Sequence, residues 1–344
     1  MTDALAPTSL GDMARGYFRG KLLCAAVRLG IADALGDGEK SLDELALATS
    51  SNSDSLYRVL RALASIGVVA EVASARFVLT QFGQPLRRDA PHSVWASMVF
   101  WADLLADSWT YLADCVRAGG KAGVAIAMER EGVKSRWSVE PDAQAIFHAV
   151  FAEPTAEDMA TVIATHDFSR YRVVADLGGA GGGLLSAVLI ANPQVRGILV
   201  DRNEAVANAA SRLKAIGLAD RCEFLPGDLL EAVPRGADAY VMQSVLHGYD
   251  DTNARRILQN CRAAIVSEGR LLLIEVVLPA IVEHADSAVE AMLMADINML
   301  AVTGGRERNR AEWSFLLSSA GFELRLIVSV PWSPSSIIES VPCD

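Results

Sequence analysis

A glycine-rich loop between an expected strand and an expected helix constrains the fold of this chain more than any other feature. The apolar run 173–176 ends in the carboxylate of Asp176, and five of the six residues at 178–183 are glycine. An apolar pattern typical of a helix follows at 184–191. Because glycine has no Cβ, such a loop lets the backbone adopt positive φ and approach a ligand closely. A strand that enters a helix through such a loop marks the ligand-binding edge of an open α/β sheet.

The spacing of these glycines narrows the choice of ligand. The dinucleotide fingerprint G-x-G-x-x-G, begun at Gly179, requires a glycine where Leu184 stands. A phosphate-binding loop requires a Lys-Ser or Lys-Thr pair after its last glycine, and this pair is absent from the sequence. The remaining pattern, Asp-x-Gly-Gly-x-Gly at 176–181, resembles the first motif of class I S-adenosylmethionine-dependent methyltransferases. A glycine-rich turn without a ligand is the alternative, and it leaves the carboxylate at the strand end unexplained.

Strands and helices alternate along the chain from residue 171 onward. Repeated β–α units predict a parallel sheet with helices on both of its faces. We expect strands at 173–176, 196–201, within 222–230, at 238–247 and at 269–277, and helices at 184–191, 203–217 and 251–266.

Residues 1–90 show a different pattern, which resembles a winged helix. Helical periodicity is expected at 9–36 and 56–66, with a capped helix start at Ser41 between them and a small hairpin at 68–79. Winged helices often bind DNA, but the helix that would recognise it carries only Arg58 and Arg61. The whole chain has 31 basic and 42 acidic residues, a net charge of -11. Since DNA binding depends on neutralising phosphates, we expect no nucleic-acid partner.

Length and composition set further limits. A chain of 344 residues, 51% of them hydrophobic, suggests about two domains with well-filled cores. The first residues lack the basic and apolar regions of a signal peptide, and no apolar run reaches 18 residues. The five cysteines are scattered and contain no C-x-x-C pair. We therefore expect a cytoplasmic protein without a membrane partner.

A histidine follows the apolar core of the fourth expected strand. The stretch 243–251 around His247 resembles a Leu-His-Asp-Trp-x-Asp segment of small-molecule O-methyltransferases, in which the histidine is the catalytic base. Imidazole titrates near neutrality, so it can accept a proton from a phenol. Two positions depart from the segment, because Gly248 and Tyr249 replace the usual Asp and Trp. The stretch therefore specifies O-methylation less well than the glycine loop specifies the cofactor.

The resemblance spans nearly the whole chain. It is to bacterial members of the S-adenosylmethionine-dependent O-methyltransferase family that includes plant phenolic and polyketide-tailoring enzymes. This implies a winged-helix dimerisation domain at 1–90, a helical linker that roofs the substrate pocket at 91–165, and a Rossmann-like class I methyltransferase domain at 166–344. It also implies S-adenosylmethionine as cofactor, a homodimer and no metal.

The resemblance assigns roles to individual residues. Glu275 and Glu307 lie in segments similar to those whose glutamates flank the catalytic histidine, and we expect them to orient or stabilise the imidazole of His247. For the cofactor we expect Asp176, Gly178, Gly179, Gly181, Asp201, Asp228, Leu229 and Gln243, with Asp201 on the ribose hydroxyls and Asp228 on the adenine. For the substrate we expect Phe147, His148, Phe151, Asp296 and Met299. The aromatic residues, His148 and Met299 are each by themselves more typical of ordinary core or helix packing, whereas the Asp296 carboxylate inside an apolar helix should face something polar.

The expected function is O-methylation of a hydroxyl on an aromatic or polyketide-like small molecule in secondary metabolism, with His247 as general base. Two alternatives stay open. The altered stretch at Gly248 and Tyr249 also suits family members that use the cofactor without transferring its methyl group, such as decarboxylases, hydroxylases or pericyclases. A winged-helix regulator that retains a cofactor-like domain as a sensor is the non-enzymatic alternative.

Overall fold

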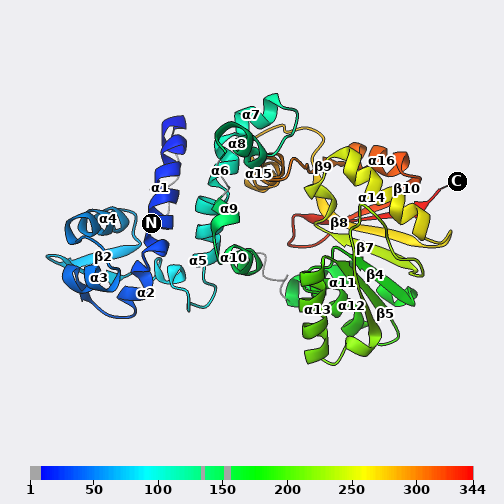
Figure 1. Cartoon of the computed structure of the whole chain (residues 1–344), viewed down its shortest axis with the longest axis horizontal. Coiled ribbons are helices and arrows are strands. Elements are labelled where there is room, and N and C mark those ends of the chain that lie inside the picture. Colours follow the sequence, from blue (N-terminus) through cyan, green and yellow to red (C-terminus); the bar gives the residue numbers. More distant parts are fainter. Residues whose placement is uncertain (1–8, 133–135, 151–155, 344) are drawn as a thin grey trace. The chain divides into compact units, whose positions relative to one another are not determined.

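The computed structural model describes residues 9–132, 136–150 and 156–343. The chain divides into two compact units (Figure 1). The first comprises Met1–Thr110 and Ala127–Ala152, and the second comprises Tyr111–Ile126 and Glu153–Asp344. Each unit is described by itself. Within the described ranges, no helix is both long and apolar enough to cross a membrane.

The first unit begins with helices followed by a small hairpin, as predicted. The helix expected at 9–36 is divided at Gly30, whose φ of 69° ends α1 and starts α2. The Ser41 side chain and Glu44 form a capping box at the start of α3. The elements are α1 (Leu10–Arg28), α2 (Ile31–Leu35), α3 (Leu42–Ala48), α4 (Ser53–Ser65), and a sheet in the order β1 (Lys40–Ser41), β3 (Arg76–Leu79), β2 (Val69–Ala73).

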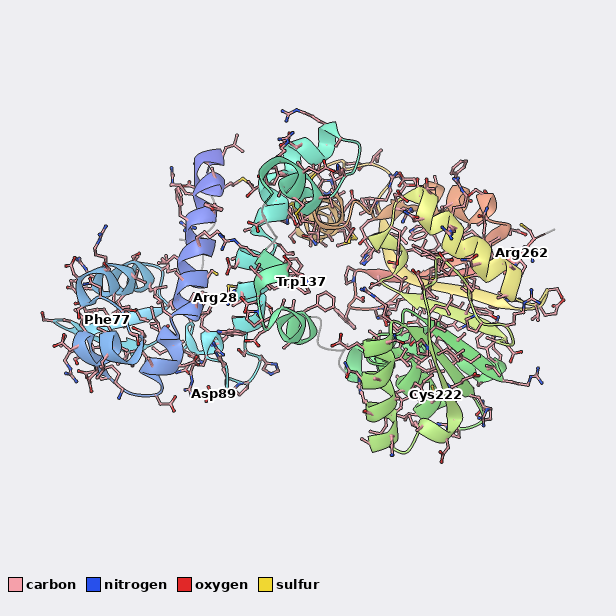
Figure 2. The ribbon with its side chains drawn as sticks, in the orientation of Figure 1. Arg28, Phe77, Asp89, Trp137, Cys222 and Arg262 are labelled. Atoms are coloured by element: carbon pink, nitrogen blue, oxygen red, sulfur yellow. The ribbon has the colours of Figure 1, made fainter. Side chains whose placement is uncertain are left out.

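Short helices complete the first unit and lead into the second. Arg28, labelled in Figure 2, lies at the end of α1. It pairs with Asp103 at 2.8 Å and with Glu140 at 2.7 Å, which ties three segments together. The elements are η2 (Gln84–Leu86), α5 (Trp95–Val99), η3 (Phe100–Leu104), α6 (Ala106–Thr110), α7 (Leu112–Arg117), α8 (Gly123–Glu131), α9 (Arg136–Val139), α10 (Ala143–Val150), α11 (Ala156–Thr165) and η4 (Phe168–Arg170).

The second unit is built on one large, mainly parallel sheet (Figure 1). Its strand order is β10-β11-β8-β7-β4-β5-β6, and β9 pairs with β8 off this path. Strand β11 runs antiparallel to both neighbours, whereas β4 to β8 pair in parallel. The strands are β4 (Val173–Leu177), β5 (Arg196–Asp201), β6 (Cys222–Pro226), β7 (Ala239–Gln243), β8 (Arg270–Leu278), β9 (Arg308–Asn309), β10 (Phe322–Ser329) and β11 (Ser335–Pro342).

Helices cover both faces of this sheet, which confirms the predicted α/β class I methyltransferase architecture. One buried cluster contains Leu258 and Trp313 from α14 and α16, and the other contains Leu185 and Leu213 from α12 and α13. The helices are α12 (Gly183–Ala191), α13 (Asn203–Ala215), α14 (Asp251–Ala264), α15 (Ser287–Val302) and α16 (Arg310–Ser319), with 3₁₀ turns η5 (Ala219–Arg221) and η6 (Leu246–Gly248). The fourth strand is shorter than expected: it ends at Gln243, and Ser244 has a φ of 53°.

The two sides of α12 differ in burial, so they offer a matched test of the core. Leu185 is fully buried and Ile190 is 65% exposed. Leu185→Ala should lower the free energy of unfolding of the second unit by about 2–5 kcal/mol, because it removes buried methyl groups and leaves a cavity. Ile190→Ala should change it by less than about 0.5 kcal/mol. Urea denaturation followed by circular dichroism measures both, and equal losses would contradict this packing.

Candidate functional site

The loop after β4 reaches its shape only because glycine occupies its tight positions. Gly178 and Gly182 have φ of 73° and 79°. A Cβ on Gly178 would lie 2.8 Å from a methyl of Val245, and one on Gly182 would lie 2.7 Å from a methyl of Leu213. Gly181 lies half-buried in the same turn. Gly178 and Gly182 therefore pack closely on Val245 and Leu213 because they have no side chain.

Asp176 lies beneath this loop and is only 2% exposed. A Cβ on Gly179 would approach its Oδ2 atom to 2.7 Å. Oδ2 has no hydrogen-bond partner within the described structure. Burial, together with the charge of Asp201, raises the Asp176 pKa to about 7. A buried carboxyl with an unsatisfied oxygen at a loop is a polar group that a ligand can satisfy.

Asp201 ends β5 and binds the glycine loop directly. Its Oδ2 accepts from the Ala180 amide at 2.9 Å, and its Oδ1 accepts from the Arg202 amide at 2.6 Å. Each carboxylate oxygen retains a further lone pair, so the group can still accept from two hydroxyls of a ligand. Beside it, Arg202, Asn203, Glu204, Pro226 and Gly227 line an open recess of about 470 Å³.

The residues expected at the adenine lie at the end of β6 but differ in exposure. The Asp228 side chain is exposed, and its Oδ1 accepts from the Leu230 amide at 2.9 Å. Leu229 is only 7% exposed and belongs to the core cluster of α14 and α16. Asp228 is thus the member of this pair that faces solvent at the sheet edge.

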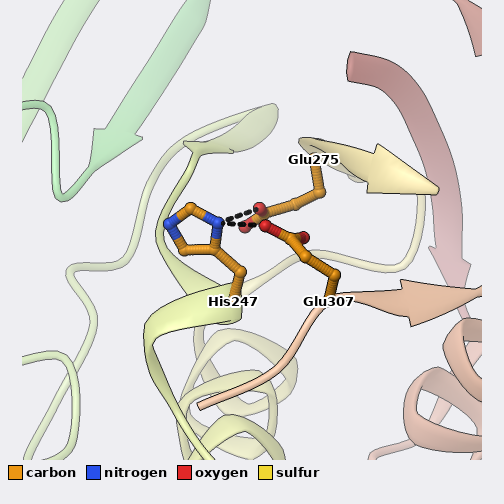
Figure 3. A group of neighbouring side chains, drawn as sticks. All are labelled: His247, Glu275 and Glu307. Atoms are coloured by element: carbon orange, nitrogen blue, oxygen red, sulfur yellow. Dashed lines mark hydrogen bonds and ion pairs between the residues drawn. The ribbon is translucent and has the colours of Figure 1, made fainter. Parts of the chain in front are cut away.

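His247 lies in η6, at the carboxyl end of β7, with two buried carboxylates on the same side of its ring (Figure 3). Its Nδ1 atom lies 2.8 Å from Oε1 of Glu307 and 3.8 Å from Oε2 of Glu275. Burial lowers the imidazole pKa, but the hydrogen bond to Glu307 and the charges of both glutamates outweigh burial and raise it. Nδ1 therefore donates to Glu307, and Nε2 is the nitrogen that can accept a proton.

Glu275 also holds the backbone of this turn. Its Oε1 accepts from the amides of Val245 at 3.0 Å and Leu246 at 2.8 Å. Its Oε2 has no hydrogen-bond partner in the described structure, and the Glu275 residue as a whole is 1% exposed. Burial chiefly raises its pKa, to about 7, while the nearby His247 opposes the rise.

Asp296 reaches the site indirectly. Its Oδ1 accepts from the backbone amide of Glu307 at 2.8 Å, so it fixes the residue that contacts His247. Burial raises its pKa. Met299, also expected at the substrate, lies half-buried on the same helix, α15, and its carbonyl accepts from Thr303.

A cavity of about 410 Å³ opens on the other face of the same sheet edge. Gln243 and Ile274 line it together with the connection between β10 and β11, which carries the fully exposed Trp332. Sequence reasoning missed this connection, whose signal was the run Pro331–Pro334. Phe147, expected at the substrate, lies in α10 of the first unit and is 37% exposed. His148 lies in the same helix, and Phe151 lies outside the described residues.

The group of His247, Glu275 and Glu307 also has the chemistry of metal ligands. One ligand atom from each residue lies within 4.8 Å of the other two. The same atoms serve a hydrogen bond between imidazole and carboxylate, which requires no ion. The expectation of a metal-free site stays a prediction.

Comparison with known proteins matches both parts of the chain. An O-methyltransferase dimerisation domain matches residues 12–86, and an O-methyltransferase domain matches residues 109–323. The O-demethylpuromycin-O-methyltransferase of Streptomyces alboniger is 35% identical over 95% of this chain and 87% of its own length.

Solved structures agree along the whole chain. A mitomycin 7-O-methyltransferase has a TM-score of 0.85 at 31% identity and covers 97% of each chain. An O-methyltransferase from neocarzinostatin biosynthesis, in complex with S-adenosylmethionine and 2-hydroxy-5-methyl naphthoic acid, has a TM-score of 0.82 at 29% identity, over 98% of this chain and 99% of that one.

The buried Asp176 generates a pH-dependent prediction. Its pKa of about 7 in the folded chain exceeds the unfolded value of about 3.9, so its stabilising contribution is complete below pH 4 and is lost as pH rises through 7. Asp176→Asn removes this loss, so the variant should gain stability relative to wild type between pH 5 and 8. The midpoints of urea denaturation at pH 5 and at pH 8 measure this gain in stability. Asp220→Asn, which changes an exposed aspartate, is the control. Parallel curves for wild type and Asp176→Asn would contradict it.

Proposed function

Because the chain belongs to the O-methyltransferase family, we propose that it methylates a hydroxyl of an aromatic or polyketide-like small molecule in secondary metabolism, with S-adenosylmethionine as the methyl donor. The observation that carries the proposal is the polarised imidazole of His247, held by Glu307 at the carboxyl edge of the sheet that also bears the glycine loop. Ligands of open α/β sheets bind at this edge.

The residues around the glycine loop fit the cofactor. The free lone pairs of Asp201 suit the two ribose hydroxyls, and the recess beside Arg202 suits the adenine, with Asp228 following its lining residue Gly227 in the chain. The bare backbone at Gly178 and Gly179 suits close approach of the remaining polar part, and the unsatisfied Oδ2 of Asp176 lies beneath this loop. When bound, S-adenosylmethionine supplies an electrophilic methyl group on a sulfonium.

In the proposed mechanism His247 activates the acceptor hydroxyl. A neutral phenol is a weak nucleophile with a pKa of about 10. Nε2 of His247 would accept the proton of this hydroxyl as its oxygen takes up the methyl group. The Glu307 carboxylate at Nδ1 stabilises the imidazolium produced, while Glu275 holds the turn through the Val245 and Leu246 amides.

Removal of the base should separate turnover from cofactor binding. His247→Ala should lower kcat by about 10²–10⁴-fold, the usual contribution of general-base catalysis, with little change in affinity for S-adenosylhomocysteine. His284→Ala, at an exposed position, is the matched control. A screen of phenols read by mass spectrometry supplies the substrate, whose product must gain one methylene unit. Wild-type turnover in His247→Ala, or a product without that gain, would overturn the mechanism.

The cofactor assignment is tested without a substrate. Asp201→Ala loses two charged hydrogen bonds worth about 1.5–3 kcal/mol each, so affinity for S-adenosylhomocysteine should fall by about 10²–10⁴-fold. Isothermal titration calorimetry measures the affinity, and Asp220→Ala at the opposite edge of the sheet should leave it unchanged. Equal affinity of Asp201→Ala and wild type would exclude Asp201 from the cofactor site.

The dimerisation match at 12–86 and the exposed apolar side chains of α1 together favour a homodimer. Leu10, Met13, Tyr17 and Phe18 are each more than half exposed. Phe18→Asp buries a charge in such an interface and should shift the protein to monomer in sedimentation velocity at micromolar concentration. Phe315→Asp changes an equally exposed phenylalanine of the second unit, and it should remain dimeric. A monomeric wild type would remove the proposal.

A further inference from the structure

Arg308 follows Glu307 in the chain and is fully buried. It begins β9, whose pairing of Arg308 with Val277 extends the sheet beside the end of β8. A buried arginine requires partners for its charge and for its five N–H groups. The partners that it has in this chain surround His247.

The guanidinium contacts the backbone on both sides of His247. Nη1 donates to the carbonyl of Leu246 at 3.2 Å, and Nη2 donates to the carbonyl of Tyr249 at 3.0 Å. Nε donates to Oδ1 of Asp251, in the first turn of α14, at 3.0 Å. The guanidinium carbon also lies 5.2 Å from the ring centre of the buried Trp313. One rigid plane thus joins three points of the segment that carries the imidazole.

The residues before Arg308 also pack closely against the His247 turn. The Arg306 amide donates to the carbonyl of His247 at 2.9 Å. A Cβ on Gly305 would lie 2.6 Å from the carbonyl carbon of Gly248 and 2.8 Å from the amide nitrogen of Tyr249. The segment 305–308 therefore lies along the His247 turn and presents Glu307 to its side chain and Arg308 to its backbone.

The turn is short, and groups outside it hold part of its backbone. It consists of one short 3₁₀ turn, Leu246–Gly248, entered through Ser244 at a φ of 53°. Gly248 adds conformational freedom where the family resemblance has a carboxylate. Glu275 holds the amides at its start, and Arg308 donates to the carbonyls of Leu246 and Tyr249 at its two ends. The Leu246 carbonyl also accepts from the Tyr249 amide within the turn.

We propose that Arg308 is the positioning residue that holds the His247 turn in register with Glu307, so that Nδ1 stays hydrogen-bonded and Nε2 faces the acceptor hydroxyl. This rests on the proposed role of His247 as base. A displacement of about 1 Å at a catalytic group can cost about 100-fold in rate, which sets the expected effect. Lysine cannot replace it, because an ammonium lacks the planar fork that reaches both carbonyls and Asp251.

The matched variants are Arg308→Met, Arg308→Lys and Arg221→Met. Arg221 likewise donates to four backbone carbonyls, those of Leu189, Asn192, Pro193 and Val195, at a place remote from the ligand edge. Arg221 is half-buried, and its loss removes a carbonyl-binding arginine without touching the His247 turn.

The primary readout needs no substrate. Proton NMR of the ligand-free full chain, with ¹⁵N-labelled histidine, should show a downfield Nδ1 proton of His247, assigned by its absence in His247→Gln. Arg308→Met should lose or broaden this signal and lower kcat by about 100-fold, whereas Arg221→Met should keep both. An unchanged signal and kcat in folded Arg308→Met would overturn the proposal.

If Arg308→Met does not fold, Arg308→Lys decides, because it retains the positive charge over Trp313. An attenuated Nδ1 signal with at least about a 10-fold lower kcat supports positioning by the fork, and wild-type behaviour overturns it. A wrong proposed function would show separately, as undiminished turnover in His247→Ala. The Nδ1 proton signal would still test whether Arg308 positions the His247 turn.

Discussion

The hydrogen bond between Nδ1 of His247 and Oε1 of Glu307, 2.8 Å long, is the interaction on which the rest of the site depends. It sets the imidazole tautomer, raises the imidazole pKa and aims Nε2 away from the protein carboxylates. A carboxylate as buried as Glu307, at 2% exposure, is costly without partners. The amide contact from Glu307 to Asp296 and the adjacent Arg308 belong to the arrangement that retains it there.

The ligand edge of the sheet keeps polar atoms that the chain itself does not satisfy. Oδ2 of Asp176 and Oε2 of Glu275 and of Glu307 are buried without hydrogen-bond partners within the described residues. Burial raises the pKa of both Asp176 and Glu275 to about 7. Unsatisfied buried carboxyls destabilise a fold, and their gathering at one edge is typical of a site built for ligands and proton transfer.

Local patterns predicted the parts of the fold that local chemistry determines. The glycine loop, the alternation of strands and helices and the capping box at Ser41 each depend on neighbouring residues, and each is confirmed in the fold. The family resemblance predicted that His247, Glu275 and Glu307 share one site. In the structure, one ligand atom of each residue lies within 4.8 Å of those of the other two.

Contacts between segments that are distant in the chain could not be predicted from local sequence patterns. Asp296 read as a polar residue for the pocket, but its carboxylate binds the Glu307 amide. The sequence pattern assigned no role to Arg308, and three of its hydrogen-bond partners lie 57 to 62 residues earlier in the chain. The early end of β7 at Gln243 likewise depends on the turn that Glu275 holds, and not on the apolar run that suggested a longer strand.

The most direct test of the account is the pH dependence of single-turnover methyl transfer in wild type and in Glu307→Gln. The base must be neutral, so the rate should fall as pH drops through the raised pKa of His247. Without the Glu307 carboxylate that pKa decreases, and the acid limb of the profile should move to lower pH. Acid limbs that coincide in the two proteins would contradict the claim that Glu307 tunes His247 as the proton acceptor.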